Sequence, residues 1–168
     1  MRKAYEPCTE LVLHYRPPCQ IATLWQFLKD RSLGGMESWE GQGPHAVLRR
    51  TLRWPHASHA ITGWLALRWD RTQTVVHLQV SASLGPVLPQ VVAQVRDWLD
   101  LDAEPARIAQ IIGRDFPHAL GQRLPGCLDG FELAVRAILG QQISVKAART
   151  LGQRLVNTLG EPCTTPWP

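Results

Sequence analysis

Hydrophobic and polar residues alternate with a period of two over much of the first half of the chain. Such alternation is typical of β-strands that bury one face and expose the other. Residues 70–73 separate two of these runs as a hairpin loop would. Shorter runs at residues 9–15 and 36–40 predict two more strands. The apolar positions of the three longer runs are Ala46, Leu48, Leu52 and Trp54; Ile61, Gly63, Leu65, Leu67 and Trp69; and Thr74, Val76, Leu78, Val80 and Ala82.

Two segments with apolar residues three and four positions apart flank these runs and predict amphipathic helices. They cover residues 20–31 and about 87–99. The apolar face of an antiparallel sheet needs a cover, and these helices can supply it. The pattern therefore predicts an α+β domain over residues 1–100. The apolar helix positions are Ile21, Leu24, Trp25 and Leu28 in the first, and Val87, Val91, Val95, Trp98 and Leu99 in the second.

Residues 101–168 show only the helical period and predict a second, all-helical region. Its first helix follows an acidic seam at residues 100–105, whose carboxylates are candidates to cap it. This helix carries Ile108, Ile111 and Ile112. The seam is therefore the predicted boundary between the two regions.

Two further helices are predicted from their end signals. Asp129 and Glu132 have the spacing of a capping box, and Ser144 can cap the second helix. Gly140 and Gly160 are the expected stops. We expect both helices to bury an apolar stripe. The stripes are Phe131, Val135, Ile138 and Leu139 in the first helix, and Val145, Ala148, Leu151, Leu155 and Leu159 in the second.

The turn between these two helices contains Gln141 and Gln142. A helical hairpin usually has a short turn of small residues, whereas these two side chains present four N–H donors and several acceptor lone pairs. One interpretation is an ordinary solvated turn. The other is a probe that enters a flat environment rich in hydrogen bonds, such as a base stack.

Composition and charge narrow the possible partners and compartment. With 45% hydrophobic and 19% charged residues, the chain can bury a core and is not a disordered tail. A net charge of +4 permits a polyanionic partner without requiring one. The sequence has no run that would span a membrane and no signal-peptide core, so we expect a cytoplasmic protein. The four cysteines lack metal-ligand spacing and predict free thiols and no metal site.

Arginines and tryptophans on the predicted sheet each allow two readings. Arg49, Arg53, Arg68 and Arg71 fall on the solvated face, where they either bind phosphates or keep the sheet soluble. Trp54 and Trp69 share the apolar parity, so core packing is favoured over base stacking. Trp64 falls on the other face, and its role stays open.

The stretch RLPGCLDGFELAVRAILGQQISVKAA, from Arg123 to Ala148, resembles the opening of the catalytic domain of the 3-methyladenine DNA glycosylase II family, within the helix-hairpin-helix glycosylase superfamily. Tyr15-Arg16-Pro17-Pro18 resembles the family's beginning, where a strand runs into YRPP and then a helix. The resemblance implies a sheet domain like the TATA-binding protein's in residues 1–100. It also implies that residues 101–168 are the first helices of the glycosylase domain, incomplete.

The resemblance assigns the turn a role in DNA binding. In this family the residue at the Gln142 position enters the duplex and fills the gap left by a flipped nucleotide. Several relatives carry an aliphatic residue there, so the depth of insertion by Gln142 stays open. The implied DNA-binding residues are Gln141, Gln142, Ser144 and Lys146. The implied partner is double-stranded DNA with alkylated bases, bound by a monomer when the enzyme is complete.

The activity implied by the resemblance is hydrolysis of the N-glycosidic bond of an alkylated base, without a cofactor or metal. In such enzymes the helix-hairpin-helix motif and the catalytic aspartate lie downstream of the GQQIS turn (residues 140–144), hence beyond Pro168. None of the chain's own aspartates matches that position, so we expect no catalytic residue here and an inactive chain. The chain is thus expected to be the front part of a glycosylase, as a truncated gene product or a shortened version.

A second hypothesis is a noncatalytic module that binds DNA or another protein. It rests on the missing aspartate and the positive charge. Lys146, Arg149 and Arg154 would contact a DNA backbone under either hypothesis. They equally fit the polar side of an amphipathic helix.

Overall fold

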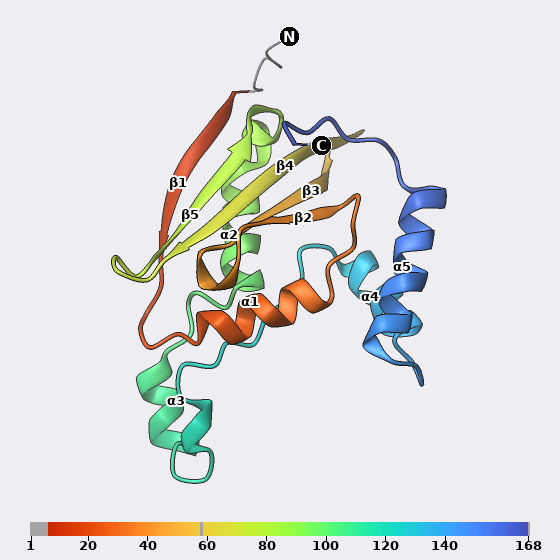
Figure 1. Cartoon of the computed structure of the whole chain (residues 1–168). Helices are drawn as coiled ribbons and strands as arrows, with labels where there is room; N and C mark the ends of the chain where they lie inside the picture. Colours follow the sequence, from red (N-terminus) through yellow and green to blue (C-terminus); the bar gives the residue numbers. More distant parts are fainter. Residues whose placement is uncertain (1–6, 58, 168) are drawn as a thin grey trace.

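The computed structural model describes residues 7–57 and 59–167, which form a five-stranded antiparallel sheet and a set of helices around it (Figure 1). The strand order is β1-β5-β4-β3-β2, and all pairs are antiparallel. The strands are β1 (Cys8–His14), β2 (Glu37–Glu40), β3 (Val47–His56), β4 (His59–Asp70) and β5 (Val75–Ser81). All five predicted strands are confirmed, with small shifts at their ends.

The alternation places one set of side chains in the core, as predicted. Leu65 and Leu67 of β4 and Val80 of β5 are fully buried. Trp69 lies in the same core, where its ring contacts Tyr15 and Trp25 edge to face at centroid distances of 4.8 and 5.5 Å. Hydrophobic burial on this face is the main stabilising term for the fold.

Two helices cover the apolar face, again as predicted. They are α1 (Ile21–Asp30) and α2 (Leu88–Trp98), the latter preceded by the 3-10 helix η2 (Ala82–Val87). The buried residues of α1 are Ile21, Leu24 and Trp25. The α+β class of this half is therefore confirmed. A further 3-10 turn, η1 (Gly43–His45), lies between β2 and β3.

The remaining helices follow in chain order. They are α3 (Pro105–Ile112), the 3-10 turn η3 (Pro117–Ala119), α4 (Gly130–Leu139) and α5 (Val145–Leu159). Figure 1 shows α3 apart from the sheet and α4 beside α5 past the end of α1. Among the described residues, none of these helices is long and apolar enough to span a membrane.

The expected acidic cap of α3 is wrong. Glu104 occupies the cap position, but its side chain makes no capping bond within the described residues. Asp102 instead accepts a hydrogen bond from Nε of Arg96 at 3.0 Å. The seam carboxylate is therefore used to tie the chain back to α2.

Trp64 packs against the end of the chain. Its ring and that of Trp167 meet edge to face at 5.2 Å, and Trp64 is only 4% exposed. The guanidinium of Arg49 lies 5.7 Å from the Trp167 ring, and Arg53 forms a 4.0 Å ion pair with Glu161. Two of the four arginines expected to be solvated thus contact the segment after α5, which crosses the outer face of the sheet.

Candidate nucleic-acid interface

The candidate interface is the hairpin formed by α4, the turn at residues 140–144, and α5. Both helices begin at the predicted caps. Oδ1 of Asp129 accepts a hydrogen bond from the Glu132 amide at 2.6 Å, and Oγ of Ser144 accepts one from the Ala147 amide at 3.2 Å. Capping fixes where each helix starts, and therefore which residues remain in the turn.

Only half of the expected capping box is present. The Asp129 carboxylate caps α4, but the Glu132 carboxylate turns away from the helix end and pairs with Arg50 and Arg136. Burial raises the pKa of the Glu132 carboxyl, but the two guanidinium groups outweigh it and hold the pKa below its usual range. The Glu132 carboxylate thus pairs with Arg50 from the sheet instead of accepting a hydrogen bond from a backbone amide at its own helix end.

Gln141 and Gln142 are both exposed at the turn. The Gln141 side-chain amide donates to the Ala137 carbonyl at 3.2 Å, which holds it against the end of α4. Gln142 has a backbone φ of +57°, in the left-handed region that non-glycine residues rarely occupy. Strained backbone of this kind is concentrated at functional positions. The geometry is compatible with a projecting side chain at Gln142.

The start of α5 has the properties of an anion-binding helix end. Its first turn contains no acidic residue, and Lys146 lies within that turn and is exposed. The free amide groups and the helix dipole favour negative charge at this position. Arg149 and Arg154 are exposed further along the same helix. Together with Ser144, these residues make α5 the basic side of the hairpin.

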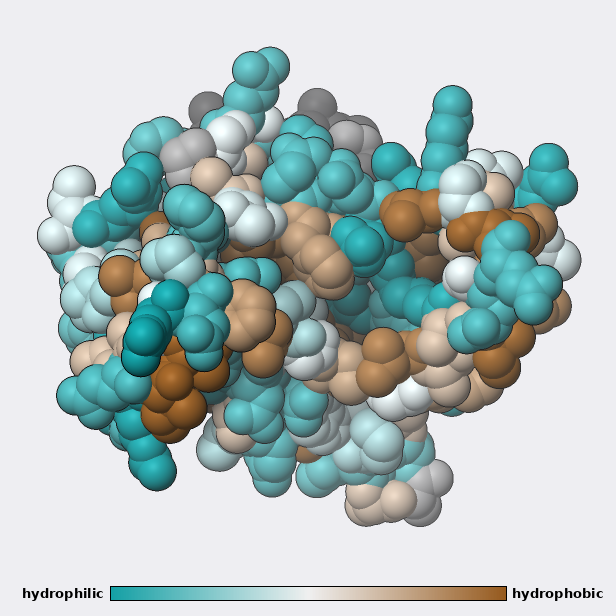
Figure 2. Space-filling view, turned by 90° about the horizontal axis from the view of Figure 1, so that it is seen from below, coloured by the Kyte–Doolittle hydropathy of each residue, from teal (hydrophilic) through white to brown (hydrophobic). Residues whose placement is uncertain are grey.

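The predicted burial of the two apolar stripes is wrong. Phe131 and Ile138 of α4 are 78% and 71% exposed, and Leu159 of α5 is 73% exposed. Val145, Leu151 and Leu155 are exposed as well, by 39–48%. Figure 2 shows apolar residues gathered on the right of the view, over this hairpin. The periodicity identified an apolar face correctly, but the described residues leave much of it uncovered.

The side of α5 that contacts the loop between α1 and β2 is instead built around Gly152. A Cβ at this position would lie 3.1 Å from a methyl carbon of Leu33, so only glycine allows the close approach without displacing Leu33. The next residue, Gln153, donates from its amide to the Gly34 carbonyl at 2.6 Å. The loop at residues 31–35, between α1 and β2, is therefore the segment against which α5 packs.

Arg50 is the site residue that sequence reasoning missed. It lies on β3 with its side chain only 5% exposed, and it pairs with Glu37 of β2 and with Glu132 of α4. A signal was present, because Arg50 shares the parity of Leu48 and Leu52 and so belongs to the buried face. A charged residue at a buried position requires partners of opposite charge.

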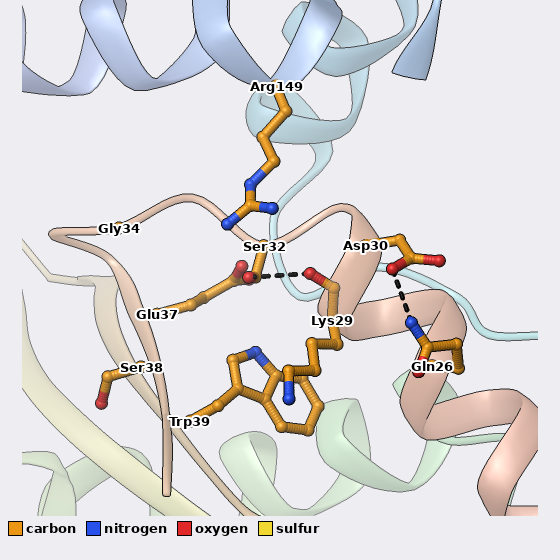
Figure 3. Close-up of a pocket in the computed structure, with 9 residues that line it drawn as sticks. All are labelled: Gln26, Lys29, Asp30, Ser32, Gly34, Glu37, Ser38, Trp39 and Arg149. Atoms are coloured by element: carbon orange, nitrogen blue, oxygen red, sulfur yellow. Dashed lines mark hydrogen bonds between the residues drawn. The ribbon is translucent and has the colours of Figure 1, made fainter. Parts of the chain in front are cut away.

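A polar cavity of about 430 Å³ lies between α1, β2 and α5. Figure 3 shows Arg149 extending from α5 toward Glu37, with Trp39 across the cavity. Ser32 donates to the Lys29 carbonyl at its wall. Arg149 therefore extends into this cavity, while Lys146 is exposed in the first turn of α5. Among the described residues, no cluster of side chains has the composition of a metal site.

Comparisons with known proteins identify one matching family model and several similar proteins. The family model described as "AlkA N-terminal domain" matches residues 10–129. DNA-3-methyladenine glycosylase 2 of Escherichia coli K12 is 32% identical over 149 residues, which is 89% of this chain and 50% of that protein. A probable bifunctional transcriptional activator/DNA repair enzyme AlkA of Mycobacterium tuberculosis is 46% identical over 76 residues, covering 42% of this chain and 15% of that protein.

The chain spans about half the length of the E. coli relative. Among solved structures, "Structure of MBOgg1 in complex with low affinity DNA ligand" aligns with a TM-score of 0.49 and 13% identity, covering 77% of this chain and 51% of the other. This structural likeness is too weak to bear on function.

Proposed function

The chain belongs to the AlkA N-terminal domain family, and from this premise we propose that it supplies the sheet domain and the DNA-inserting turn of an enzyme that removes alkylated bases from double-stranded DNA. The E. coli relative is named as a glycosylase of 3-methyladenine in DNA. The observation that carries the proposal is the conformation of Gln142. This residue is exposed between two capped helices, and its backbone is in the left-handed region.

Insertion at Gln142 would serve base flipping. A base must leave the helix before its N-glycosidic bond can be hydrolysed, at a cost of a few kcal/mol that is lower for a damaged pair. A side chain that fills the gap offsets part of this cost. The glutamine amide carries donors and acceptors that can satisfy the base left without its partner. Gln141 borders the same gap.

Contacts to the DNA backbone would come from the start of α5. The amide groups after Ser144 and the charge of Lys146 are placed to bind one phosphate beside the inserted residue. Arg154 extends the basic side along the helix. This arrangement predicts a marked salt dependence of binding, since each phosphate contact releases condensed counterions.

We further propose that the catalytic aspartate lies outside residues 1–168. Supporting this, three aspartates of the helical half and its seam have structural roles: Asp129 caps α4, Asp102 pairs with Arg96, and Asp100 accepts from the Leu124 amide at 3.0 Å. The proposal includes the division near residue 100 into a sheet domain and a helical domain. It also includes action as a monomer and a reaction that needs no cofactor.

The test is 2-aminopurine fluorescence in a duplex with an abasic site next to the reporter base. The 168-residue chain should raise the emission several-fold on binding, because insertion unstacks the reporter. Gln142→Ala should lose most of this rise. Gln90→Ala, which removes an exposed glutamine from α2, is the matched control and should behave as the parent chain.

Three results would count against the proposal. Binding without any rise in emission would exclude insertion. An equal rise for Gln142→Ala and the parent chain would show that Gln142 is not the inserted residue. Affinity that does not change between about 50 and 200 mM salt would argue against backbone contacts by Lys146 and its neighbours.

A further inference from the structure

Four charged side chains meet where α4 contacts the sheet. This charge cluster consists of Glu37 of β2, Arg50 of β3, and Glu132 and Arg136 of α4. Nη1 of Arg50 lies 2.5 Å from Oε1 of Glu37, while its Nη2 pairs with Glu132. Nε of Arg136 lies 2.6 Å from Oε1 of Glu132, and its Nη2 lies 3.4 Å from Oε1 of Glu37.

The cluster is largely buried, and the charges of its four members balance. The exposed fractions of the four side chains are 7% for Glu37, 5% for Arg50, 16% for Glu132 and 26% for Arg136. Two carboxylates face two guanidinium groups, so the formal net charge is zero. The guanidinium of Arg50 also lies 5.6 Å from the Trp98 ring centroid, a cation–π contact with α2. Arg50 therefore has partners on β2, α2 and α4.

A cluster of this kind specifies a position more than it adds stability. Desolvation of buried charges offsets most of their mutual attraction, but removal of one member leaves an uncompensated buried charge. Any tilt or slide of α4 that separates Glu132 from Arg50 has that consequence. The Arg50 guanidinium bridges two carboxylates at once, so it admits few alternative placements of the helix.

The cluster contacts the base of α4, and the glutamine turn follows its other end. Glu132 lies in the first turn of the helix, nine residues before Gln141. At 1.5 Å per residue this is a rigid arm of roughly 14 Å, so a tilt of about 10° at the base would move the turn by about 2 Å. Arg136 adds a second attachment, because it donates to the Arg31 carbonyl.

We propose that Arg50 is a positioning residue: through the charge cluster it fixes α4 on the sheet and thereby sets where the Gln141–Gln142 turn meets DNA. The inference rests on the proposed function for its DNA consequence. Its structural part, the docking of α4 by the cluster, is independent of DNA. The tests below separate the two parts.

The first test is hydrogen exchange of Arg50→Met in the 168-residue chain without DNA. Amides of α4 should exchange at least tenfold faster, whereas amides of β4 and β5 should stay within about twofold of the parent chain. Glu132→Gln keeps the side-chain shape and should give the same result. It replaces Arg50→Met in this test if Arg50→Met does not fold. Arg49→Met is the matched control, because Arg49 lies on the opposite face of the sheet and pairs only with Glu40 in the ion-pair network of the described residues.

Rescue identifies the physical cause. The double variant Arg50→Met with Glu132→Gln leaves Glu37 and Arg136 as a neutral pair, so α4 protection should return to within about threefold of the parent chain. Unchanged exchange in both single variants would overturn the proposal. Equal loosening in the single and double variants would also overturn it, because loss of packing alone would then explain the effect.

The second test is the 2-aminopurine signal. At saturating protein, Arg50→Met should reduce the emission rise at least threefold. Its affinity for the duplex should stay within about threefold, because the phosphate contacts of α5 remain. An unchanged rise with a loosened α4 would overturn the positioning role. If the parent chain gives no rise, the proposed function fails, and the exchange experiment still decides whether the cluster docks α4.

Discussion

The sheet with its covering helices and the helical hairpin are both built from amphipathic elements, yet their apolar faces are buried to different extents. Leu65, Leu67 and Val80 in the sheet are fully buried, whereas Phe131 and Leu159 in the hairpin are more than 70% exposed. The sheet is joined to α1 and α2 by apolar packing. The hairpin is joined to the sheet by the charge cluster, by the Gln153–Gly34 hydrogen bond and by the close contact at Gly152.

This difference shows that apolar periodicity identifies a face but not what covers it. Much of the apolar side of α4 and α5 is exposed, and the opposite side is held by polar contacts together with the close approach of Gly152 to Leu33. Polar contacts are directional and fix an orientation, while apolar burial supplies most of the free energy of folding. The stability of the fold and the placement of the hairpin should therefore respond to different substitutions.

The largest expected contrast is between Trp69→Ala and Phe131→Ala. Trp69 is 1% exposed and contacts two other aromatic rings, so its truncation should lower the free energy of unfolding by about 3–5 kcal/mol. Phe131 is 78% exposed, and its truncation should change the free energy by less than about 0.5 kcal/mol. Urea unfolding followed by tryptophan fluorescence measures both. Similar losses would mean that the hairpin's apolar face is covered after all.

A smaller contrast is expected between two glycines. In Gly63→Ala on β4, the new methyl carbon would lie 2.3 Å from Oγ of Ser81 and 2.6 Å from Cγ of Leu84, so the chain must shift at a cost of about 1–3 kcal/mol. In Gly130→Ala at the start of α4, no described atom lies within 4 Å of the new carbon, apart from the adjacent residues and the helix's own backbone. Alanine favours the helix there, so stability should stay equal or rise by up to about 1 kcal/mol. Thermal unfolding of both variants measures these changes. A loss of stability in Gly130→Ala would contradict the open environment of this glycine.

The smallest effect is expected from acid and should be confined to the hairpin. The pKa of Glu132 is lower folded than unfolded, because Arg50 and Arg136 favour its charged form more strongly than burial opposes it. The charged Glu132 therefore contributes its full stabilisation of α4 docking above its ordinary pKa of 4.5. This stabilisation is lost as the pH falls through the lower pKa that Glu132 has in the folded chain. Exchange protection of α4, corrected for intrinsic rates, should fall in that window.

Glu132→Gln is the control for the acid experiment. The variant lacks the titrating group, so its α4 protection should be low already at neutral pH and should fall little further below pH about 4.5. An acid-induced loss as steep as in the parent chain would assign the effect to other carboxylates, such as Asp102 or Asp70, whose pKa values are also lowered by their hydrogen bonds.

Local signals in the sequence determined the elements and their ends. Alternation at Leu65 and Leu67 identified β4 and its buried face, and Asp129 and Ser144 marked the starts of α4 and α5. These predictions succeeded because a period or a cap depends on residues at most a few positions apart. The Gln141–Gln142 turn was found in the same way, as the segment left between two capped helices.

Only the tertiary structure decided which partners these elements meet. Glu132 could serve its own helix end or a distant arginine, and the arginine lies 82 positions earlier on β3. Trp64 is covered by Trp167, and Gly152 allows α5 to reach Leu33. The physical reason is the same in each case: a buried charge or an apolar surface requires a partner, but the local sequence does not specify which distant segment the folded chain brings to it.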